Sequence, residues 1–323
     1  MENPYLTPGR VRAALRSLDL RPTRGMGQNF LVDPSALDTI VAAAELNRAD
    51  TVVEVGPGLG VLTWELLQRA GRVVAVELDR RLAARLHEEF AGAQNLEIVQ
   101  GDILNLAPEQ LLADHRPPIT EDGRLKIEDS DANADGTLSS ILDPRSSNDP
   151  PYKVVANLPY AITSAVLRHF LEAERKPKIM VVLVQWEVAL RITARPGDLS
   201  VLAHSVQIYA EPEIVARVPA GSFLPAPAVD SAVLLLQLRP RPAVEVDDID
   251  KLMRVIKAGF LQARKKLSNA LPSGLAAMGM RIDKQRAIAV LEATGVDPGR
   301  RAETLTLEEW AGVYRHLALR RGE

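Results

Sequence analysis

The alternation of short apolar segments with longer amphipathic segments restricts the fold of this chain most strongly. From position 51 to position 184 the short segments are typical of strands and the longer ones of helices. Because the strands are apolar at almost every position, both of their faces must be covered, as in a parallel sheet between helices. The expected strands are Thr51–Val55, Arg72–Glu77, Leu96–Val99, Lys153–Ala156 and Lys178–Val184, and the expected helices are Leu59–Arg69, Arg80–Phe90 and Thr163–Glu172. We therefore predict an α/β fold with a doubly wound, mostly parallel sheet.

Two helices are expected before this alternation. Val11, Leu15 and Leu18 share one face of the first helix. Asp33-Pro34 combines a capping carboxylate with a proline in the first turn, and it predicts a second helix that runs to about Ala44.

The C-terminal part changes from strands to helices. Strands expected at Val201–Tyr209 and Ser231–Leu238 would form a hairpin at the sheet edge. After position 242 the sequence predicts only helices, at Ile249–Ala270, Lys284–Thr294 and Leu307–Arg320. We therefore expect two domains, residues 1–240 and a smaller all-helical domain of residues 241–323.

The net charge of −3 conceals an uneven distribution. A segment at about 116–151 is rich in Asp, Ser, Asn and Pro, and we interpret it as an acidic, mobile surface insertion. Residues 117–150 carry a net −5, so the rest of the chain carries +2. The first thirty residues hold five arginines, and residues 251–281 hold seven basic and no acidic side chains. These two clusters are either solvated helix faces or surfaces that attract a phosphate backbone.

Several classes of protein are disfavoured by what the sequence lacks. It has no cysteine, so it has no disulfide framework and no thiolate metal site. Its longest purely apolar run, Ile179–Val184, is far shorter than the roughly 18 residues of a membrane span. The N-terminus has no apolar core of a signal peptide. No histidine has metal-ligand spacing, and His169 is expected to be a surface or core residue. We predict a cytoplasmic protein with neither a membrane segment nor a metal.

A glycine-rich turn follows the first predicted strand of the sheet. The sequence there is Val52-Val53-Glu54-Val55-Gly56-Pro57-Gly58-Leu59-Gly60. Gly56 and Gly58 match the dinucleotide fingerprint G-x-G-x-x-G, but Val61 stands where the third glycine belongs. Glycine also lets the backbone approach a ligand closely, so both glycines are assigned to a cofactor site. A nucleoside cofactor is favoured over one with a pyrophosphate.

Two carboxylates follow the next two strands. Glu77 ends the second strand, where a carboxylate accepts hydrogen bonds from ribose hydroxyls. Asp102 follows the third strand and could accept from an adenine amine. Either acid alone is more often a helix cap or a surface charge. Matching features at three consecutive strand ends favour the ligand site.

The fourth strand ends in Asn157-Leu158-Pro159-Tyr160, which suits methylation of an aromatic amine. The lone pair of such an amine is delocalised into the ring, so acceptors for its two protons would aim it at a sulfonium methyl. The Asn157 side-chain oxygen and the Leu158 carbonyl can be those acceptors. Pro159 fixes the backbone, and Tyr160 offers a flat face for the base. Elsewhere in a chain the tetrapeptide would be a turn with a packed tyrosine.

Phe223 is a candidate for the second side of a base sandwich. It lies in Ser222-Phe223-Leu224-Pro225-Ala226-Pro227, a segment that its prolines stiffen. Simple core packing is the alternative. A base held in this way must be unstacked, which favours single-stranded or looped RNA.

Together these residues resemble the small-subunit (16S) ribosomal RNA adenine dimethyltransferase family. The resemblance begins at Gly27-Gln28-Asn29-Phe30-Leu31, includes the motifs above, and continues through Phe223 to Val233 into the helical tail. It implies a seven-stranded, Rossmann-like methyltransferase sheet and S-adenosylmethionine as the cofactor. It implies that the target adenine is held by Asn157 to Tyr160 and by Phe223. The residues that it places around the cofactor are Asn29, Leu31, Gly56, Glu77, Asp102 and Asn157.

The resemblance also implies a substrate and partners. The family places two methyl groups on each of two neighbouring adenines near the 3′ end of small-subunit ribosomal RNA, in a maturing 30S-type subunit. A monomer is expected, and the helical domain helps to engage the subunit. The residues expected to contact RNA are Arg254, Lys257, Arg264, Lys265 and Lys266.

The sequence departs from the family at three places. Trp186 replaces a residue that is usually basic or polar, and the segment from Pro196 to Ser200 looks shortened; both put local RNA contacts in question. The third departure is the acidic insertion. Its Asp131, Asn133 and Asp135 match half of a calcium loop, but Leu142 stands where the loop needs a bidentate Glu, which disfavours calcium.

Two alternatives stay open on the sequence alone. One is a large-subunit ribosomal RNA adenine methyltransferase of the antibiotic-resistance type, which shares most motifs. The other is a non-catalytic assembly factor on the same fold. The Phe223 segment and the basic tail favour the small-subunit enzyme, and the intact Asn157 tetrapeptide favours catalysis.

Overall fold

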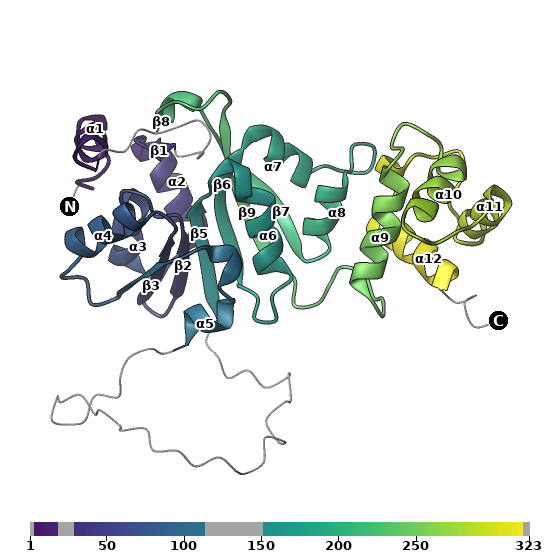
Figure 1. Cartoon of the computed structure of the whole chain (residues 1–323), viewed down its shortest axis with the longest axis horizontal. Coiled ribbons are helices and arrows are strands. Elements are labelled where there is room, and N and C mark those ends of the chain that lie inside the picture. The colour runs from purple at the N-terminus through teal and green to yellow at the C-terminus, as the bar shows by residue number, and fades with distance from the viewer. Residues whose placement is uncertain (1–2, 19–28, 114–150, 319–323) are drawn as a thin grey trace, which may run out of the picture.

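A computed structural model describes residues 3–18, 29–113 and 151–318, and all structural statements concern these ranges (Figure 1). A seven-stranded sheet forms the centre of the larger part, with the strand order β4-β3-β2-β5-β6-β9-β7. The first five strands in that order pair in parallel, and β9 and β7 close one edge antiparallel. The strands are β2 (Thr51–Val55), β3 (Arg72–Glu77), β4 (Leu96–Gln100), β5 (Tyr152–Asn157), β6 (Ile179–Gln185), β7 (Ala210–Val218) and β9 (Ser231–Leu238). The predicted α/β class with its mostly parallel sheet is confirmed.

Helices cover both faces of the sheet, because neighbouring residues of each strand point to opposite faces and both sets are apolar. On one face, residues such as Val53 and Val55 pack in a cluster with Phe170 of α6. On the other face, Val52 packs in a cluster with Leu37 of α2. The helices of this part are α1 (Pro8–Ser17), α2 (Pro34–Ala44), α3 (Val61–Arg69), α4 (Arg80–Glu89), α5 (Pro108–Leu112), α6 (Thr163–Leu171), α7 (Trp186–Ile192) and α8 (Val201–Gln207).

The two predicted N-terminal helices are present. Val11 and Leu15 of α1 are buried, as their spacing predicted. Asp33 caps α2, since its side chain accepts from the backbone N–H of Ser35 at 2.9 Å. Helix α2 packs across β5, β6, β9 and β7, and α1 lies at the end of the molecule opposite the C-terminal helices (Figure 1).

A second, two-stranded sheet joins distant parts of the chain. Strand β1 (Phe30–Leu31) pairs antiparallel with β8 (Phe223–Leu224). The side-chain hydroxyl of Ser222 also donates to the Asp33 carboxylate at 2.6 Å. The segment before α2 is therefore fixed against the loop before β9.

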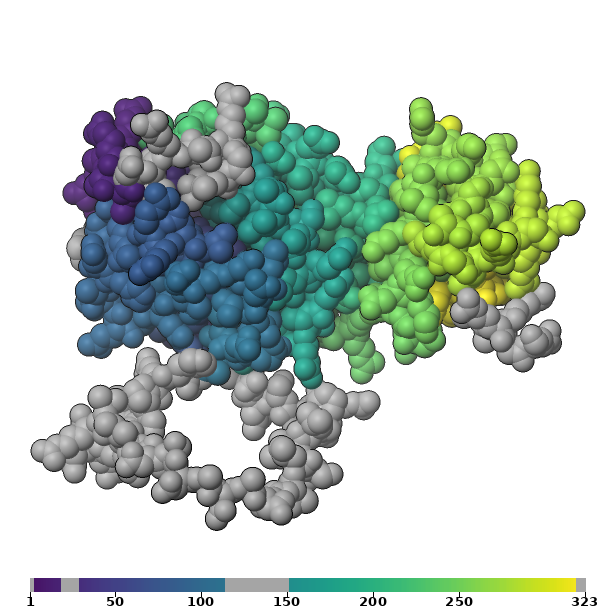
Figure 2. Space-filling model, in the orientation of Figure 1, coloured from purple at the N-terminus to yellow at the C-terminus, as the bar shows by residue number. Residues whose placement is uncertain are grey.

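The C-terminal helices have a core of their own and lie at one end of the molecule (Figures 1 and 2). They are α9 (Ile249–Phe260), α10 (Leu267–Ala277), α11 (Lys284–Ala293) and α12 (Leu307–Ala318). Trp310 fills the centre of this core, and its ring lies so close to Gly259 that a Cβ added there would clash with it. Ile208, at the end of α8, is part of the same cluster and links it to the larger part.

One predicted strand was wrong. Val201–Tyr209 contains helix α8, because the Ser200 side chain caps its first turn by accepting from Ala203 N at 3.1 Å. The edge strand that pairs with β9 is β7, which carries Pro212 and a bulge, as edge strands tolerate. The predicted antiparallel hairpin at the edge is therefore present, with a different first strand.

The single helix predicted over Ile249–Ala270 is two helices. The chain turns between Phe260 and Leu267, so that α10 folds back against α9 with Gly274 directly on Ala258. Two backbone N–H groups in the first turn of α10 have no acceptor within the helix, and they donate instead to the carbonyls of Pro298 and Arg300. The predicted acidic insertion, including the calcium motif Asp131, Asn133 and Asp135, lies outside the described residues, apart from Pro151.

Candidate active site

A cavity of about 450 Å³ opens at the carboxyl ends of the parallel strands β2, β3, β4 and β5. Ligands of doubly wound sheets bind at this edge. Strand β1 and helix α2 contribute the opposite wall, through residues such as Phe30 and Ile40. The predicted site residues that line the cavity are Asn29, Leu31, Gly56, Gly58, Glu77, Asp102, Asn157, Leu158, Pro159 and Tyr160.

The glycine turn after β2 needs its glycines. Gly58 has φ +60°, where a side chain is strained, and an added Cβ would lie 3.1 Å from the Phe30 ring. The backbone N–H of Gly58 donates to Glu77 Oε2 at 3.0 Å. The turn is therefore held against the end of the neighbouring strand β3.

Glu77 is buried at the end of β3, and two backbone groups orient its carboxylate. Oε2 accepts from Gly58, and Oε1 accepts from Asp79 N at 2.9 Å. Burial raises the pKa of Glu77, while these two N–H donors act in the opposite direction. Each oxygen keeps a lone pair for a further donor, which suits the two hydroxyls of a ribose.

Asp102 caps a short helix and also lies at the cavity, so the cap does not exclude the ligand role predicted for it, which stays a prediction. Its Oδ1 accepts from Leu104 N at 3.0 Å, which caps the short 3₁₀ helix η2 (Ile103–Asn105). It also lines the cavity. The cap fixes the carboxylate in place at the end of β4.

Asn157 is the last residue of β5, and the structure fixes the orientation of its amide. Its Nδ2 donates to the backbone carbonyl of Asn29 at 3.0 Å. A carbonyl can only accept, so this end of the amide must be the NH₂ group, and Oδ1 is the end that can accept from a ligand.

Leu158, Pro159 and Tyr160 continue from Asn157 along the cavity wall. Leu158 N donates to Leu183 O at 3.2 Å, which holds the start of the segment on β6. The Tyr160 hydroxyl lies 2.6 Å from Ser231 Oγ, and burial raises the pKa of Tyr160. Tyr160 is therefore held at its hydroxyl, and the segment that carries it is held on β6 through Leu158.

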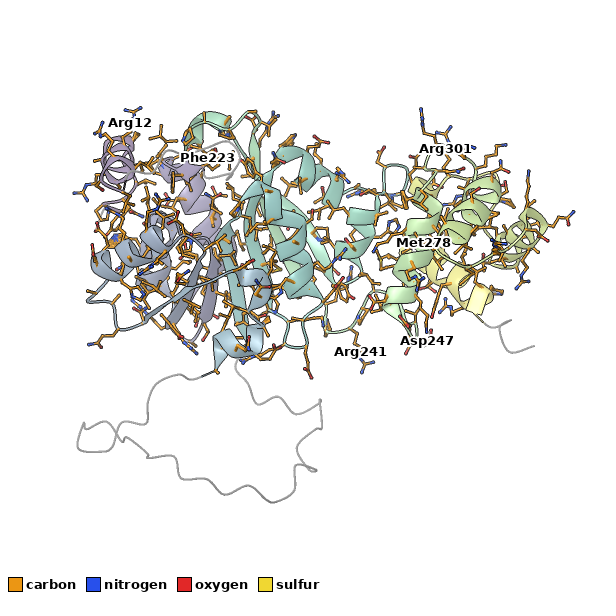
Figure 3. All side chains as sticks on the ribbon, viewed as in Figure 1. Arg12, Phe223, Arg241, Asp247, Met278 and Arg301 are labelled. Carbon is orange, nitrogen blue, oxygen red and sulfur yellow. The ribbon has the colours of Figure 1, made fainter. Side chains whose placement is uncertain are left out.

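Phe223 is placed differently from the other predicted residues. It is 3% exposed and packs in the core cluster under α2, and it is not among the described residues that line the cavity (Figure 3). The backbone pairing of Phe223 with Leu31 in the β1–β8 sheet holds it there. Its stacking on a base stays a prediction, which would require the ring to leave this core.

Sequence reasoning assigned no role to Glu54, which also lines the cavity. Its side chain is 1% exposed, and no described residue donates a hydrogen bond to its Oε2. Burial raises the pKa of Glu54 to about 8. A charged residue inside an otherwise apolar strand is the signal that could have identified it. A buried carboxylate of this kind suits a cationic ligand group.

The predicted RNA-contacting residues lie on helix α9 and in the turn that follows it. Arg264, Lys265 and Lys266 are exposed together in the turn between α9 and α10. Arg254 lies on α9 and donates to Met278 O at 3.1 Å, at the end of α10. Lys257 is half-buried; burial raises the pKa of Glu172 on the larger part, and the charges of Arg168 and Lys257 oppose that rise.

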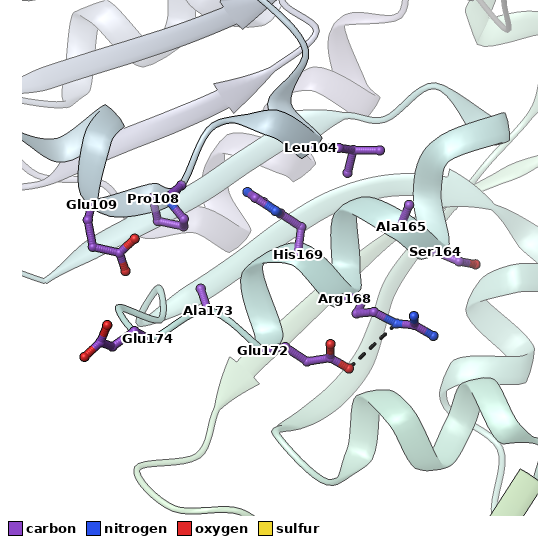
Figure 4. Close-up of a pocket in the computed structure, with 11 residues that line it drawn as sticks. Leu104, Pro108, Glu109, Ser164, Ala165, Arg168, His169, Glu172, Ala173 and Glu174 are labelled. Carbon is purple, nitrogen blue, oxygen red and sulfur yellow. Dashed lines mark ion pairs between the residues drawn. The ribbon is translucent and has the colours of Figure 1, made fainter. Parts of the chain in front are cut away.

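A larger hollow of about 710 Å³ lies elsewhere, between α5, η2 and α6 (Figure 4). Its charged side chains include Glu109, Glu172, Glu174 and Arg168, and the last pairs with Glu172 at 3.7 Å. None of the predicted site residues lines it. Despite its size, it lacks the groups at the strand ends that a nucleoside needs.

Two features are absent from the described residues. No three His, Cys, Asp or Glu side chains in these ranges gather as metal ligands. No described helix combines the length and the apolar character that crossing a membrane requires.

The fold and the site define a class of protein. A seven-stranded sheet with a reversed edge strand and a nucleoside-type cavity at its strand ends is that of a methyltransferase that uses S-adenosylmethionine. Among solved structures, the 23S rRNA methyltransferase ErmE is 28% identical, with a TM-score of 0.60 over 90% of this chain and 99% of its own. A dimethyladenosine transferase from Plasmodium falciparum shares the fold, with a TM-score of 0.64 and 23% identity over 88% and 95% of the two chains.

Sequence relatives narrow the class. The protein named Ribosomal RNA small subunit methyltransferase A in Moorella thermoacetica is 43% identical over 96% of this chain and 98% of its own length. The protein of the same name in Dehalococcoides mccartyi strain CBDB1 is 42% identical over 93% and 90%. Residues 21–314 match the family described as Ribosomal RNA adenine dimethylase. The chain belongs to this family, and the prediction of an enzyme that dimethylates adenines of ribosomal RNA is confirmed at that level.

Proposed function

We propose that this chain transfers methyl groups from S-adenosylmethionine to the exocyclic amines of two adjacent adenines near the 3′ end of small-subunit ribosomal RNA. The observation that carries the proposal is the amide of Asn157, fixed by Asn29 at the strand end beside a nucleoside-sized cavity. The relatives at 42–43% identity act, by their names, on the small subunit.

The residues of the cavity fit this cofactor. Glu77 suits the ribose hydroxyls and Asp102 the adenine amine, and the glycine turn allows close approach of the backbone. Glu54 supplies a buried acceptor near a cationic group, and the cofactor contains both an ammonium and a sulfonium. When bound, the cofactor supplies the activated methyl group, so that the protein needs no covalent nucleophile. Asn29 and Leu31 complete the wall.

The chain's own residues position the target amine. Asn157 Oδ1 and the Leu158 carbonyl accept its two protons, which turns the nitrogen lone pair toward the reacting carbon. Tyr160 stacks on the base, and its hydrogen bond to Ser231 keeps the ring in place. The methylated nitrogen loses one proton on transfer, and that proton passes to solvent.

The two parts of the chain take different tasks. Residues 1–240 bind the cofactor and carry out the transfer, and residues 241–323 engage the RNA of a maturing 30S-type subunit through Arg264, Lys265 and Lys266, with Arg254 and Lys257 nearby. The enzyme works as a monomer in the cytoplasm, where subunits mature. The separate core of the C-terminal helices supports this division.

A transfer assay tests the proposal. Small subunits from cells that lack the dimethylation should accept up to four labelled methyl groups each, two on each of two adjacent adenines. Transfer only to large-subunit RNA would instead favour the activity named for the ErmE structure. Cofactor binding without transfer to either subunit would favour a non-catalytic assembly role and refute the proposal.

A further inference from the structure

Trp186 lies one residue beyond the part of the sheet that anchors Tyr160. Ser231, whose hydroxyl contacts Tyr160, pairs through its backbone with Gln185 of β6. Trp186 follows Gln185 directly, and its N–H donates to Asp230 O at 2.9 Å. The backbone of Trp186 is therefore fixed at the carboxyl end of β6, which is the same edge of the sheet at which the cavity opens, and its side chain packs partly against the core.

Arg217 of the edge strand β7 lies over this indole. Its Cζ is 4.9 Å from the centre of the Trp186 ring. Asp230 holds the guanidinium, with Oδ2 at 2.9 Å from Nε and 2.8 Å from Nη2. Asp230 is itself fixed, because its Oδ1 accepts from Ala220 N at 2.9 Å. The guanidinium is thus oriented on one side, while the Arg217 side chain remains 58% exposed.

Apolar side chains continue this surface. Leu190, one helical turn after Trp186 on α7, is 47% exposed, and Val229, next to Asp230, is 45% exposed. An exposed apolar surface that contains an oriented arginine suits a partner that is flat, apolar on its faces and attached to negative charge. An unpaired nucleobase on its phosphate backbone has these properties.

We propose that Trp186 and Arg217 form a stacking platform for an unpaired base next to the target adenine. The inference rests on the proposed function, since it assumes an RNA substrate with its target at Asn157–Tyr160. The outer face of the guanidinium receives the base, and the indole supports the guanidinium from behind. The platform would hold the flanking nucleotide while the target base enters the cavity, so it acts in RNA binding rather than in the transfer step.

The first experiment measures binding of an RNA hairpin whose loop contains the target adenines. Arg217→Gln and Trp186→Ala should each weaken binding about tenfold, within the range of base–aromatic stacking. They should leave the affinity for S-adenosylmethionine and the rate constant of saturated transfer unchanged. Arg217→Lys keeps the charge but loses the plane, so it should also weaken binding, with the same salt dependence. Binding by Arg217→Lys at the wild-type level would overturn the proposal, because charge alone would then suffice.

The second experiment identifies the base. Each nucleotide beside the target adenines is replaced in turn by an abasic one. At one position, removal of the base should weaken binding to the wild-type protein about tenfold. The Trp186→Ala protein should bind the same abasic RNA as tightly as it binds the intact RNA. An equal loss in both proteins at every position would overturn the proposal. The proposal would also be overturned if Trp186→Ala weakened binding to intact subunits but not to the hairpin RNA, since that result would indicate a ribosomal protein as the partner.

Two controls make these outcomes specific. Arg175 lies 5.9 Å from the Tyr152 ring at the opposite end of β5, so Arg175→Gln removes a similar pair far from the cavity and should not change binding. Trp186→Phe keeps an aromatic face and should stay within about threefold of wild type. Because binding and transfer are measured separately, a platform that binds RNA without any methyl transfer would refute the proposed function and leave the platform standing.

Discussion

The Nδ2 of Asn157 donates to the backbone carbonyl of Asn29, although 128 positions separate the two residues in the chain. This bond selects one of the two orientations of the amide. It presents the oxygen, rather than the NH₂ group, to the ligand. The segment at Asn29 therefore does more than line the cavity, because it determines which hydrogen-bonding group the end of β5 offers.

Replacement of Asn157 by Ala should reduce the rate of transfer by roughly 100-fold or more, because misplacement of a reacting group costs about that much. Single-turnover transfer from labelled cofactor to under-methylated small subunits measures the effect. The fold should persist, since Asn157 is only half-buried at the end of its strand. Near-normal turnover with an intact circular dichroism spectrum would contradict the assigned role.

Cofactor binding should release a proton near pH 7 if Glu54 faces the cationic part of the ligand. The pKa of Glu54 is about 8 in the free protein, so the side chain is mostly protonated at neutral pH and must ionise to pair with a cation. Affinity should therefore rise as the pH approaches 8. Calorimetry in buffers of different ionisation enthalpy detects the proton. Glu54→Gln, which keeps the shape, should abolish the release; a release that persists would assign it to another group.

The same group makes stability depend on pH. Because its folded pKa lies above the unfolded value of 4.5, the folded state binds more protons between pH 4.5 and about 8. The contribution of Glu54 to the free energy of unfolding is therefore full below pH 4.5 and is lost as the pH rises toward 8. Denaturant midpoints of wild type and Glu54→Gln should diverge over that window. Parallel pH profiles would count against a raised pKa.

Lys153 should be a strong contributor to stability. Its buried Nζ donates to the carbonyls of Ala44 and Glu45 at the end of α2 and pairs with Asp50 at 3.0 Å. Lys153→Met should lower the free energy of unfolding by about 3 kcal/mol, because it leaves a carboxylate and two carbonyls without their partner. Urea denaturation measures this loss. Adding Asp50→Asn should recover part of it, and a purely additive loss would show that the pair is not coupled.

Reversal of charge in the turn between α9 and α10 should weaken binding to small subunits. Lys265→Glu with Lys266→Glu removes two cations and adds two anions beside a phosphate backbone, so the loss should be largest at low salt and shrink as salt is added. Filter binding over a salt series measures it. The matched double reversal at Lys176 and Lys178, before β6, should have little effect. Equal losses in both proteins would mean that only net charge matters.

The residues at the strand ends of the site were predictable because each one is the last residue of its strand or lies within two positions of the strand's end. Glu77, Asp102 and Asn157 needed only the strand boundaries and the rule that ligands bind at the carboxyl edge of a parallel sheet. The apolar runs made those boundaries clear.

Other features depend on tertiary contacts that no local pattern contains. Val201–Tyr209 has apolar residues that fit either a strand or a helix, and the cap from Ser200 decides for the helix. Glu54 stands out as a charge in an apolar strand, but only the fold shows that it is buried beside the cavity. Phe223 faces the core because Leu31 pairs with it, a contact across nearly 200 positions.

The β1–β8 pairing also has a consequence for how the protein is made. Residues 30 and 31 are synthesised early, whereas residues 223 and 224 are added only when about two thirds of the chain has been made, and they leave the ribosome later still. Until then one wall of the cavity has no strand to hold it. A nascent chain that ends before this point should fail to retain the nucleoside, so the protein gains its ligand late in translation, at one definable length.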